Sequence, residues 1–203
     1  MSVRIERLTG AALGRGLDAV ARLRMTVFRE WPYLYDGDLD YERDYLAGFA
    51  AGAGSIIVTA KDADDIVGAA TAAPLAEHTE DFGPLFERHG WPPDDIFYLG
   101  ESVLLPAYRG AGTGHAFFDH REAHARDLMT GGSYNFTHFA FCGVVREPLD
   151  SRRPAGYRPL DPFWENRGYD MVEGLIGHYD WLEIGAQTET RHAMQFWARK
   201  LEN

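Results

Sequence analysis

The sequence contains one cysteine, no long hydrophobic run, and fewer basic than acidic residues. Its 203 residues include 20 lysines and arginines against 31 aspartates and glutamates, which gives a formal net charge of −11. A single cysteine excludes an intrachain disulfide and is typical of the cytosol. The lack of a long apolar run argues against a membrane-spanning helix, and the acidic balance argues against general nucleic-acid binding. We therefore expect a cytoplasmic protein that binds neither membranes nor nucleic acid.

The sequence also gives little support for a metal site or a cysteine nucleophile. His120 and His124 are one helical turn apart, but the order His-Arg-Glu-Ala-His lacks the glutamate that metalloproteases carry directly after the first histidine, and no third ligand is evident. Cys142 follows Phe139-Ala-Phe in an apolar segment, where a lone cysteine is usually an inert core residue. We expect no metal and no acyl-cysteine intermediate.

What the sequence does contain is a glycine-rich turn, within residues 98–118, between an apolar strand and an amphipathic helix. Gly110, Gly112 and Gly114 let a ligand approach the main chain. The first N–H groups of the helix have no partner within it, and the helix dipole is positive there, so the turn favours an anion such as a pyrophosphate. The dinucleotide-binding pattern would need a glycine at His115, and the phosphate loop of NTPases would need a Gly-Lys-Ser/Thr ending that is missing.

The spacing Arg109-x-x-Gly112-x-Gly114, after a strand ending in Leu-Leu-Pro, resembles the acetyl-CoA pyrophosphate motif of the GNAT superfamily of N-acetyltransferases. The resemblance covers nearly the whole chain in the family's order of elements. It implies an α+β (α/β three-layer) fold, in which helices flank a central mixed, mostly antiparallel sheet, as a single domain over residues 1–203. With 45% hydrophobic residues, a chain of this length can bury such a core.

Hydrophobic periodicity places the individual elements. Apolar residues at helical spacing predict a helix over 11–29 and a weaker one over 40–50, and capping residues predict a short helix over 161–169. Two segments, 78–95 and 146–159, resemble inserted loops over the active-site side. Apolar segments bounded by turn residues predict strands at 3–8, 55–60, 66–73, 96–105, 136–144, 175–182 and 192–199.

The resemblance implies that acetyl-CoA is the acyl donor and that no metal takes part. In the family, the strand before the motif separates from its neighbour, so that free main-chain N–H groups meet the pantetheine and the thioester oxygen. Here that role falls to Val103, Leu104 and Leu105. The turn would then wrap the pyrophosphate through Arg109, Gly110, Ala111, Gly112, Thr113, Gly114 and His115.

Glu101 is the expected general base, because it lies in an otherwise apolar strand where family members often carry a carboxylate that faces the acceptor. The alternative is a structural glutamate paired with a nearby cation. The family often uses a tyrosine of the short helix as the acid, but that register falls on Trp164, which has no acidic proton. Either Tyr157 or Tyr169 takes over this catalytic role, or the thiolate leaves without a side-chain acid.

The acceptor pocket is expected between the first two helices, where aromatic residues stand beside carboxylates. Aromatic rings and carboxylates suit an amine carried on an apolar or aromatic body. The alternative is a small hydrophobic cluster under the loop with a solvated acidic rim. The expected substrate-binding residues are Phe28, Glu30, Trp31, Tyr33 and Tyr35.

These expectations combine into an N-acetyltransferase that moves an acetyl group from acetyl-CoA to a primary amine, on a small molecule or a peptide, by direct transfer in a ternary complex. Two alternatives are a catalytically silent CoA- or acyl-CoA-binding sensor and a transferase for a longer acyl-CoA. A homodimer is left open. Arg121 falls in the apolar face of the helix after the motif, so we expect it to be structural and paired with a carboxylate or with carbonyls.

Overall fold

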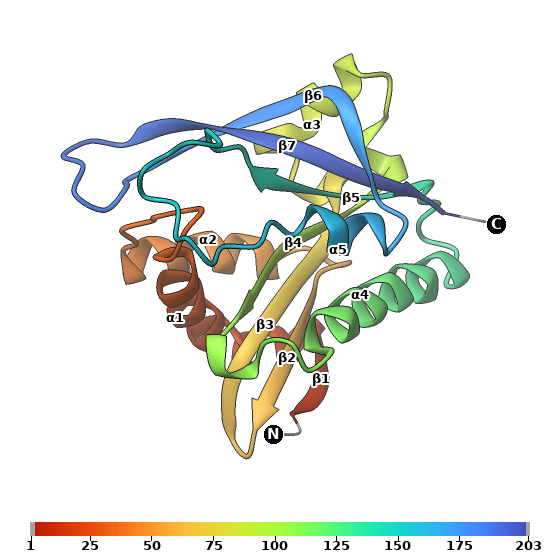
Figure 1. Cartoon of the computed structure of the whole chain (residues 1–203). Helices are drawn as coiled ribbons and strands as arrows, with labels where there is room; N and C mark the ends of the chain where they lie inside the picture. Colours follow the sequence, from red (N-terminus) through yellow and green to blue (C-terminus); the bar gives the residue numbers. More distant parts are fainter. Residues whose placement is uncertain (1–2, 202–203) are drawn as a thin grey trace.

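A computed structural model describes residues 3–201, and within them seven strands form one sheet in the order β1-β2-β3-β4-β5-β7-β6 (Figure 1). In this described part of the chain, β4 and β5 run parallel and every other neighbouring pair is antiparallel. The predicted mixed, mostly antiparallel sheet is therefore confirmed. The strands are β1 (Arg4–Thr9), β2 (Ile56–Asp62), β3 (Asp65–Pro74), β4 (Ile96–Leu104), β5 (His138–Val144), β6 (Asp170–Trp181) and β7 (Thr190–Lys200).

Helices cover both faces of this sheet, with α1 and α2 on one face and α4 on the other (Figure 1). Alternation along β2 supplies both faces, because successive side chains of a strand point in opposite directions. Ile57 packs with Val20 and Leu23 of α1, whereas Ile56 packs with Phe117 of α4. No helix among residues 3–201 is both long and apolar enough to cross a membrane. The helices are α1 (Leu17–Phe28), α2 (Leu39–Ala50), α3 (Thr79–Arg88), α4 (Thr113–Thr130) and α5 (Asp161–Glu165).

The helix predicted over 11–29 is divided in the structure. A 3-10 turn, Gly10–Arg15, precedes α1. Gly16 lies at the break, where a Cβ would approach Leu8 Cδ1 of β1 to 2.9 Å. The chain thus passes close to the sheet at this point, and glycine is the residue that permits the close approach.

The segment 78–95 is not the loop that its composition predicts, because it contains α3. Phe82 and Phe86 of this helix pack edge-on against Phe196 of β7, with ring centroids 4.9 and 5.0 Å apart. These aromatic contacts give α3 a buried face. The other predicted insertion, 146–159, contains no helix or strand.

The parallel strands β4 and β5 lie side by side only where they begin. Their register runs from Ile96 opposite His138 to Tyr98 opposite Ala140. Beyond Tyr98, β4 continues along β3 while β5 continues along β7, and the two strands diverge (Figure 1). The second half of β4 therefore presents an unpaired edge toward the gap between them.

Candidate active site

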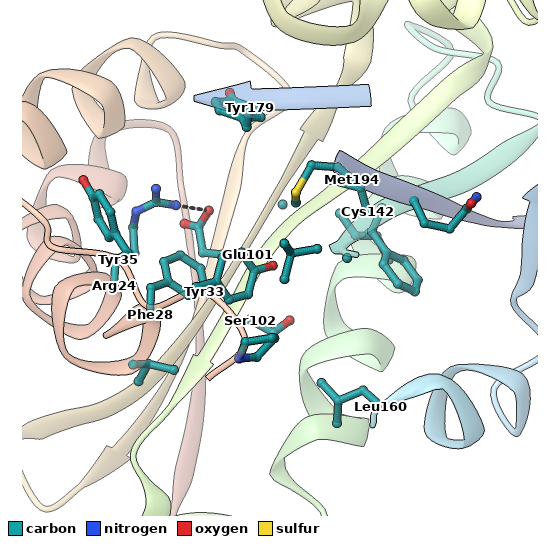
Figure 2. Close-up of a pocket in the computed structure, with 18 of the residues that line it drawn as sticks. Arg24, Phe28, Tyr33, Tyr35, Glu101, Ser102, Cys142, Leu160, Tyr179 and Met194 are labelled. Carbon is teal, nitrogen blue, oxygen red and sulfur yellow. Dashed lines mark hydrogen bonds and ion pairs between the residues drawn. The ribbon is translucent and has the colours of Figure 1, made fainter. Parts of the chain in front are cut away.

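A cavity of about 1870 Å³ opens where β4 and β5 diverge. Its walls come from α1 and the segment after it, from β4, from residues 141–164, and from β6 and β7. Figure 2 shows Glu101 near the centre of this cavity, with Arg24 and Tyr33 beside it. The predicted site residues that line the cavity are Phe28, Glu30, Trp31, Tyr33, Tyr35, Glu101, Leu104, Arg109, Gly114 and Tyr157.

The unpaired edge of β4 offers main-chain groups, but not from all three predicted residues. The N–H of Leu105 donates to a β3 carbonyl 3.0 Å away, and Val103, two residues earlier, faces the same way. Leu104 faces the gap instead, since its carbonyl accepts a hydrogen bond from Arg109 Nε at 2.9 Å. By the same alternation Ser102 also faces the gap. The residues whose main-chain groups face the gap are therefore Ser102 and Leu104. The prediction is kept for Leu104 and is wrong for Val103 and Leu105.

The glycine turn leaves the beginning of α4 open. Gly110 and Gly112 have φ values of +80° and +86°, which L side chains rarely adopt. Gly112 is the N-cap, and the first helical hydrogen bond runs from the Ala116 N–H to its carbonyl at 3.2 Å. No described side chain caps the helix, and no atom lies within 4 Å of a Cβ built at Gly110 or Gly112. The N–H groups of residues 113–115 can therefore receive an anion.

Arg109 forms an ion pair with a residue of the expected acceptor pocket. Its Nη1 pairs with Glu30 Oε2 at 3.0 Å while its Nε contacts Leu104, so the side chain lies along β4 toward α1. A predicted cofactor residue and a predicted acceptor residue thus bind each other where the two regions meet. Both side chains are nearly half exposed, and such a pair adds little to stability.

Glu101 is joined to a buried arginine that the sequence analysis missed. Its side chain is 6% exposed, and Oε2 accepts a hydrogen bond from Arg24 Nη1 at 2.7 Å. Arg24 also pairs with Glu42 of α2, which is fully buried. Burial by itself would lower the pKa of the Arg24 guanidinium, but the carboxylates beside it raise this pKa above its ordinary value. Oε1 of Glu101 is buried and has no hydrogen-bond partner among the described residues.

Arg121 holds β3 and β4 from the opposite face. It is 1% exposed and donates to the carbonyls of Thr71 and Glu101, at 3.1 and 3.4 Å, and to Ser102 Oγ at 3.0 Å. The ladder between β3 and β4 is irregular at this point. Burial lowers the pKa of Arg121 to about 10. The arginine therefore has carbonyl and hydroxyl partners, one of the two expected arrangements, and it fixes the backbone that carries Glu101.

Aromatic rings line the part of the cavity next to α1 and β6. The ring centroids of Phe28 and Tyr33 are 4.4 Å apart, and those of Tyr33 and Trp181 are 5.8 Å apart. Tyr98 of β4, which the sequence analysis did not single out, contacts Cys142 Sγ through its hydroxyl at 3.1 Å. Burial raises the pKa of Tyr33 and of Tyr98 above the ordinary tyrosine value.

Arg146 clamps the segment that carries these aromatic residues. It donates to the carbonyls of Pro32 and Tyr33 at 2.6 and 2.8 Å. It also pairs at 2.5 Å with Glu183, and Tyr35 forms an isolated β-bridge to the same glutamate. The segment after α1 is thereby tied to residues 146–159 and to the end of β6.

The two candidate acid tyrosines lie in different places. Tyr157 lines the cavity and meets the Trp31 ring edge-on, with centroids 6.1 Å apart. Burial raises the pKa of its hydroxyl. Tyr169 is fully buried in the core, and its hydroxyl donates to Glu122 Oε1 of α4 at 3.0 Å. The structure therefore does not bring Tyr169 to the cavity.

Trp164 packs among other aromatic rings. Its ring centroid lies 5.0 Å from that of Phe141 and 5.2 Å from that of Trp197. A Cβ at Gly143 would approach the indole to 2.9 Å, so glycine makes room for this ring. Cys142, the residue before Gly143, is half-buried: it packs against the core cluster that contains Phe196, as expected, and it also lines the cavity.

The two helical histidines have separate partners. His120 accepts a hydrogen bond from Arg7 Nε at 2.8 Å, and His124 Nε2 lies 3.1 Å from the Gly54 carbonyl. Among the side chains that the structure describes, no group of three or more histidine, cysteine or acidic residues is placed to hold a metal ion.

Structure comparison finds many full-length matches to GNAT-family acetyltransferases. A GNAT-family acetyltransferase from Staphylococcus aureus Mu50 is 11% identical, with 99% of this chain and 100% of that chain covered and a TM-score of 0.57. The ribosomal-protein-alanine N-acetyltransferase from Brucella melitensis is 17% identical, with 98% and 99% covered and a TM-score of 0.56. A Salmonella typhimurium structure that contains its cofactor acetyl-CoA is 11% identical, with 100% and 96% covered and a TM-score of 0.58.

The protein therefore has the fold of the GNAT acetyltransferases, with the seven-stranded sheet and flanking helices that its sequence predicts. No protein-family model and no curated protein matches the sequence itself.

Proposed function

We propose that the chain is an acetyl-CoA-dependent N-acetyltransferase that transfers an acetyl group directly to a primary amine in a ternary complex. One observation carries this proposal. A single cavity joins the unpaired edge of β4 and the beginning of α4 to the buried, unpartnered Oε1 of Glu101. The fold shared with acetyltransferases supports the same reaction, and so does the acetyl-CoA in the Salmonella typhimurium structure.

The donor end of the cavity fits acetyl-CoA. The open N–H groups of residues 113–115 suit the pyrophosphate, because the positive end of the helix dipole lies there. The edge of β4 at Ser102 and Leu104 suits the amides of the pantetheine. When bound, acetyl-CoA supplies an activated thioester whose carbonyl carbon accepts the amine nitrogen.

The acceptor arrives as an ammonium ion and must lose a proton before its nitrogen can attack. Oε1 of Glu101 accepts this proton, directly or through one water. A C–N bond then forms and the C–S bond breaks. The products are the amide and the thiol, and one proton is released to solvent. Arg24 acts as a positioning residue, because its bond to Oε2 orients Oε1 toward the cavity.

Tyr157 is the proposed source of the proton for the departing thiolate. It lines the same cavity as Glu101, and Trp164 at the register of the family's tyrosine has no acidic proton. A tyrosine hydroxyl keeps its proton at neutral pH and so has one to donate to the thiolate.

Two other functions each have one observation in their favour. The tight packing of Trp164 in place of an acid favours a sensor that binds CoA without transfer. The cavity, with a volume of about 1870 Å³, also has room for an acyl chain longer than acetyl.

The release of free thiol from acetyl-CoA in the presence of amines tests the proposal, alongside calorimetric binding of CoA. Transfer predicts thiol release that depends on the amine. CoA binding without thiol release for any amine would replace the enzyme with the sensor. A series of acyl-CoAs of increasing chain length then tests for a longer donor.

A further inference from the structure

The carboxylate of Glu101 belongs to a charge arrangement that the chain leaves incomplete. Two carboxylates, those of Glu42 and Glu101, share the guanidinium of Arg24, and their side chains are 0% and 6% exposed. The group as a whole has a formal charge of minus one. A buried carboxylate oxygen without a hydrogen-bond partner is unfavourable, so an ammonium group that reached Oε1 of Glu101 would gain a charge-assisted hydrogen bond there.

The cavity offers one such position. Of the carboxylates that line it in the described chain, Glu101 alone has a buried oxygen without a hydrogen-bond partner. Exposed carboxylates such as that of Asp44 also line the cavity, but solvent screens their charges. The buried oxygen of Glu101 therefore provides the position for one cationic group of the acceptor.

Aromatic side chains lie beside Glu101. In Figure 2, Phe28 and Tyr33 lie on one side of it. Phe28 and Tyr33 also contact each other, with centroids 4.4 Å apart. Rings of this kind bind a flat apolar body and also interact favourably with a cation at its edge.

The segment after α1 limits the size of the acceptor. Its main chain is bonded to the end of β6, from Asp36 N–H to Leu182 O at 2.8 Å and from Ile184 N–H to Leu34 O at 2.8 Å. Arg146 adds two bonds to the same segment. A tied wall of this kind favours a small molecule over a side chain presented on the surface of a folded protein.

We infer that the acceptor is a small monoamine on an aromatic body, with its ammonium group held at Oε1 of Glu101 and its ring against Phe28 and Tyr33. This inference rests on the proposed function for the reaction, but the recognition that it describes can be measured without transfer. The smallest compound with both features is 2-phenylethylamine. Ethylamine lacks the ring, and 2-phenylethanol lacks the charge.

Equilibrium binding of these three compounds, with and without CoA, separates recognition from catalysis. We expect 2-phenylethylamine to bind about 10-fold or more tightly than either of the others, since it alone has both the charge and the ring. Glu101→Gln should remove the advantage over 2-phenylethanol, and Phe28→Leu should reduce the advantage over ethylamine. Asp44→Asn is the matched control, because Asp44 lines the same cavity but is exposed.

Tighter binding of spermidine or of a lysine-containing peptide would overturn the inference, and so would equal binding of 2-phenylethylamine by the parent, Glu101→Gln and Asp44→Asn proteins. Circular dichroism of each variant checks that it is folded. If Glu101→Gln does not fold, Phe28→Leu still tests the ring contact. Monoamine binding without thiol release would contradict the proposed transfer and leave the recognition site intact. Thiol release with spermidine but not with 2-phenylethylamine would support the proposed transfer and contradict the inferred recognition of an aromatic monoamine.

Discussion

The two ends of the cavity are built from different parts of the chain. The proposed donor end consists of main-chain groups of one continuous segment, from Ser102 on β4 to His115 on α4. The proposed acceptor end consists of side chains from α1, the segment after it, β4, residues 141–164 and β6. Main-chain groups can bind only what every CoA thioester has in common, whereas side chains distinguish one acceptor from another. Changes at the donor end should therefore affect all substrates alike, and changes at the acceptor end should be selective.

The sharpest difference between the two ends is expected for Glu101→Gln. Glutamine keeps the shape of the side chain but cannot accept the proton, so turnover should fall by about 100-fold or more. CoA affinity should stay the same, because the carboxylate belongs to the acceptor end. Steady-state kinetics and calorimetry measure the two quantities. A variant as active as the parent would show that Glu101 is structural.

Trp164 separates packing from chemistry. Trp164→Phe should lower the free energy of unfolding by about 1–3 kcal/mol, because it leaves a space beside Phe141 and Trp197. Urea denaturation measures this loss, and the turnover of the folded protein should be unchanged. A selective loss of turnover in a fully stable variant would place the indole in the reaction.

Tyr157, which lines the cavity, and Tyr169, which is buried in the core, can be compared by the same substitution. Tyr157→Phe should lower turnover by about 10-fold if its hydroxyl protonates the thiolate. Tyr169→Phe should leave turnover unchanged and cost about 1 kcal/mol of stability, because it removes the buried hydrogen bond to Glu122. Kinetics and urea denaturation of both variants show which tyrosine affects turnover and which affects stability. The opposite pattern would transfer the acid role to Tyr169.

The clamp at Glu183 should give the smallest effect, and one that depends on pH. Hydrogen bonds from Arg152 and Arg146 outweigh burial and lower the pKa of the Glu183 carboxyl. A carboxyl with a lowered pKa contributes stability at neutral pH and loses that contribution as the pH falls below the ordinary value of about 4.3. Glu183→Gln should therefore be about 1 kcal/mol less stable than the parent at pH 7, with the difference shrinking toward pH 3. A difference that is constant over this range would exclude the charge as its cause.

The strand, the glycine-rich turn and the helix of the proposed donor end could be predicted because their signals are local. These elements follow one another in the chain, and the predicted anion site depends on their order. Val103 and Leu105 were misassigned for a physical reason. The direction of each N–H depends on how β4 pairs with β3, and residue spacing alone does not fix that register.

The acceptor end was predicted only in part. The aromatic residues after α1 do line the cavity, but Tyr98 and Arg146 reach it from distant segments, which no local pattern connects. Glu42 does not line the cavity and acts on it only through its pair with Arg24. Arg24 could have been found. It lies one turn from both Val20 and Phe28, on the apolar side of α1, which is the signal that singled out Arg121 on α4.

The helix α3 was missed because of its composition. Gly83 and Pro84 lie within it, and this pair is more common in loops than in helices. Its buried face forms only when Phe82 and Phe86 meet Phe196, which is more than 100 residues later in the chain. Tertiary packing thus outweighs local propensity at this point.

CoA binding to the parent, Gly112→Asp and Gly112→Asn proteins tests the central claim most directly. Both variants place a side chain of the same shape at φ +86° beside the open N–H groups of α4, and only aspartate adds a negative charge. We predict that CoA raises the melting temperature of the parent, and that Gly112→Asp binds CoA about 10-fold or more weakly than Gly112→Asn does. Equal CoA affinity in all three proteins would contradict a pyrophosphate site at this turn.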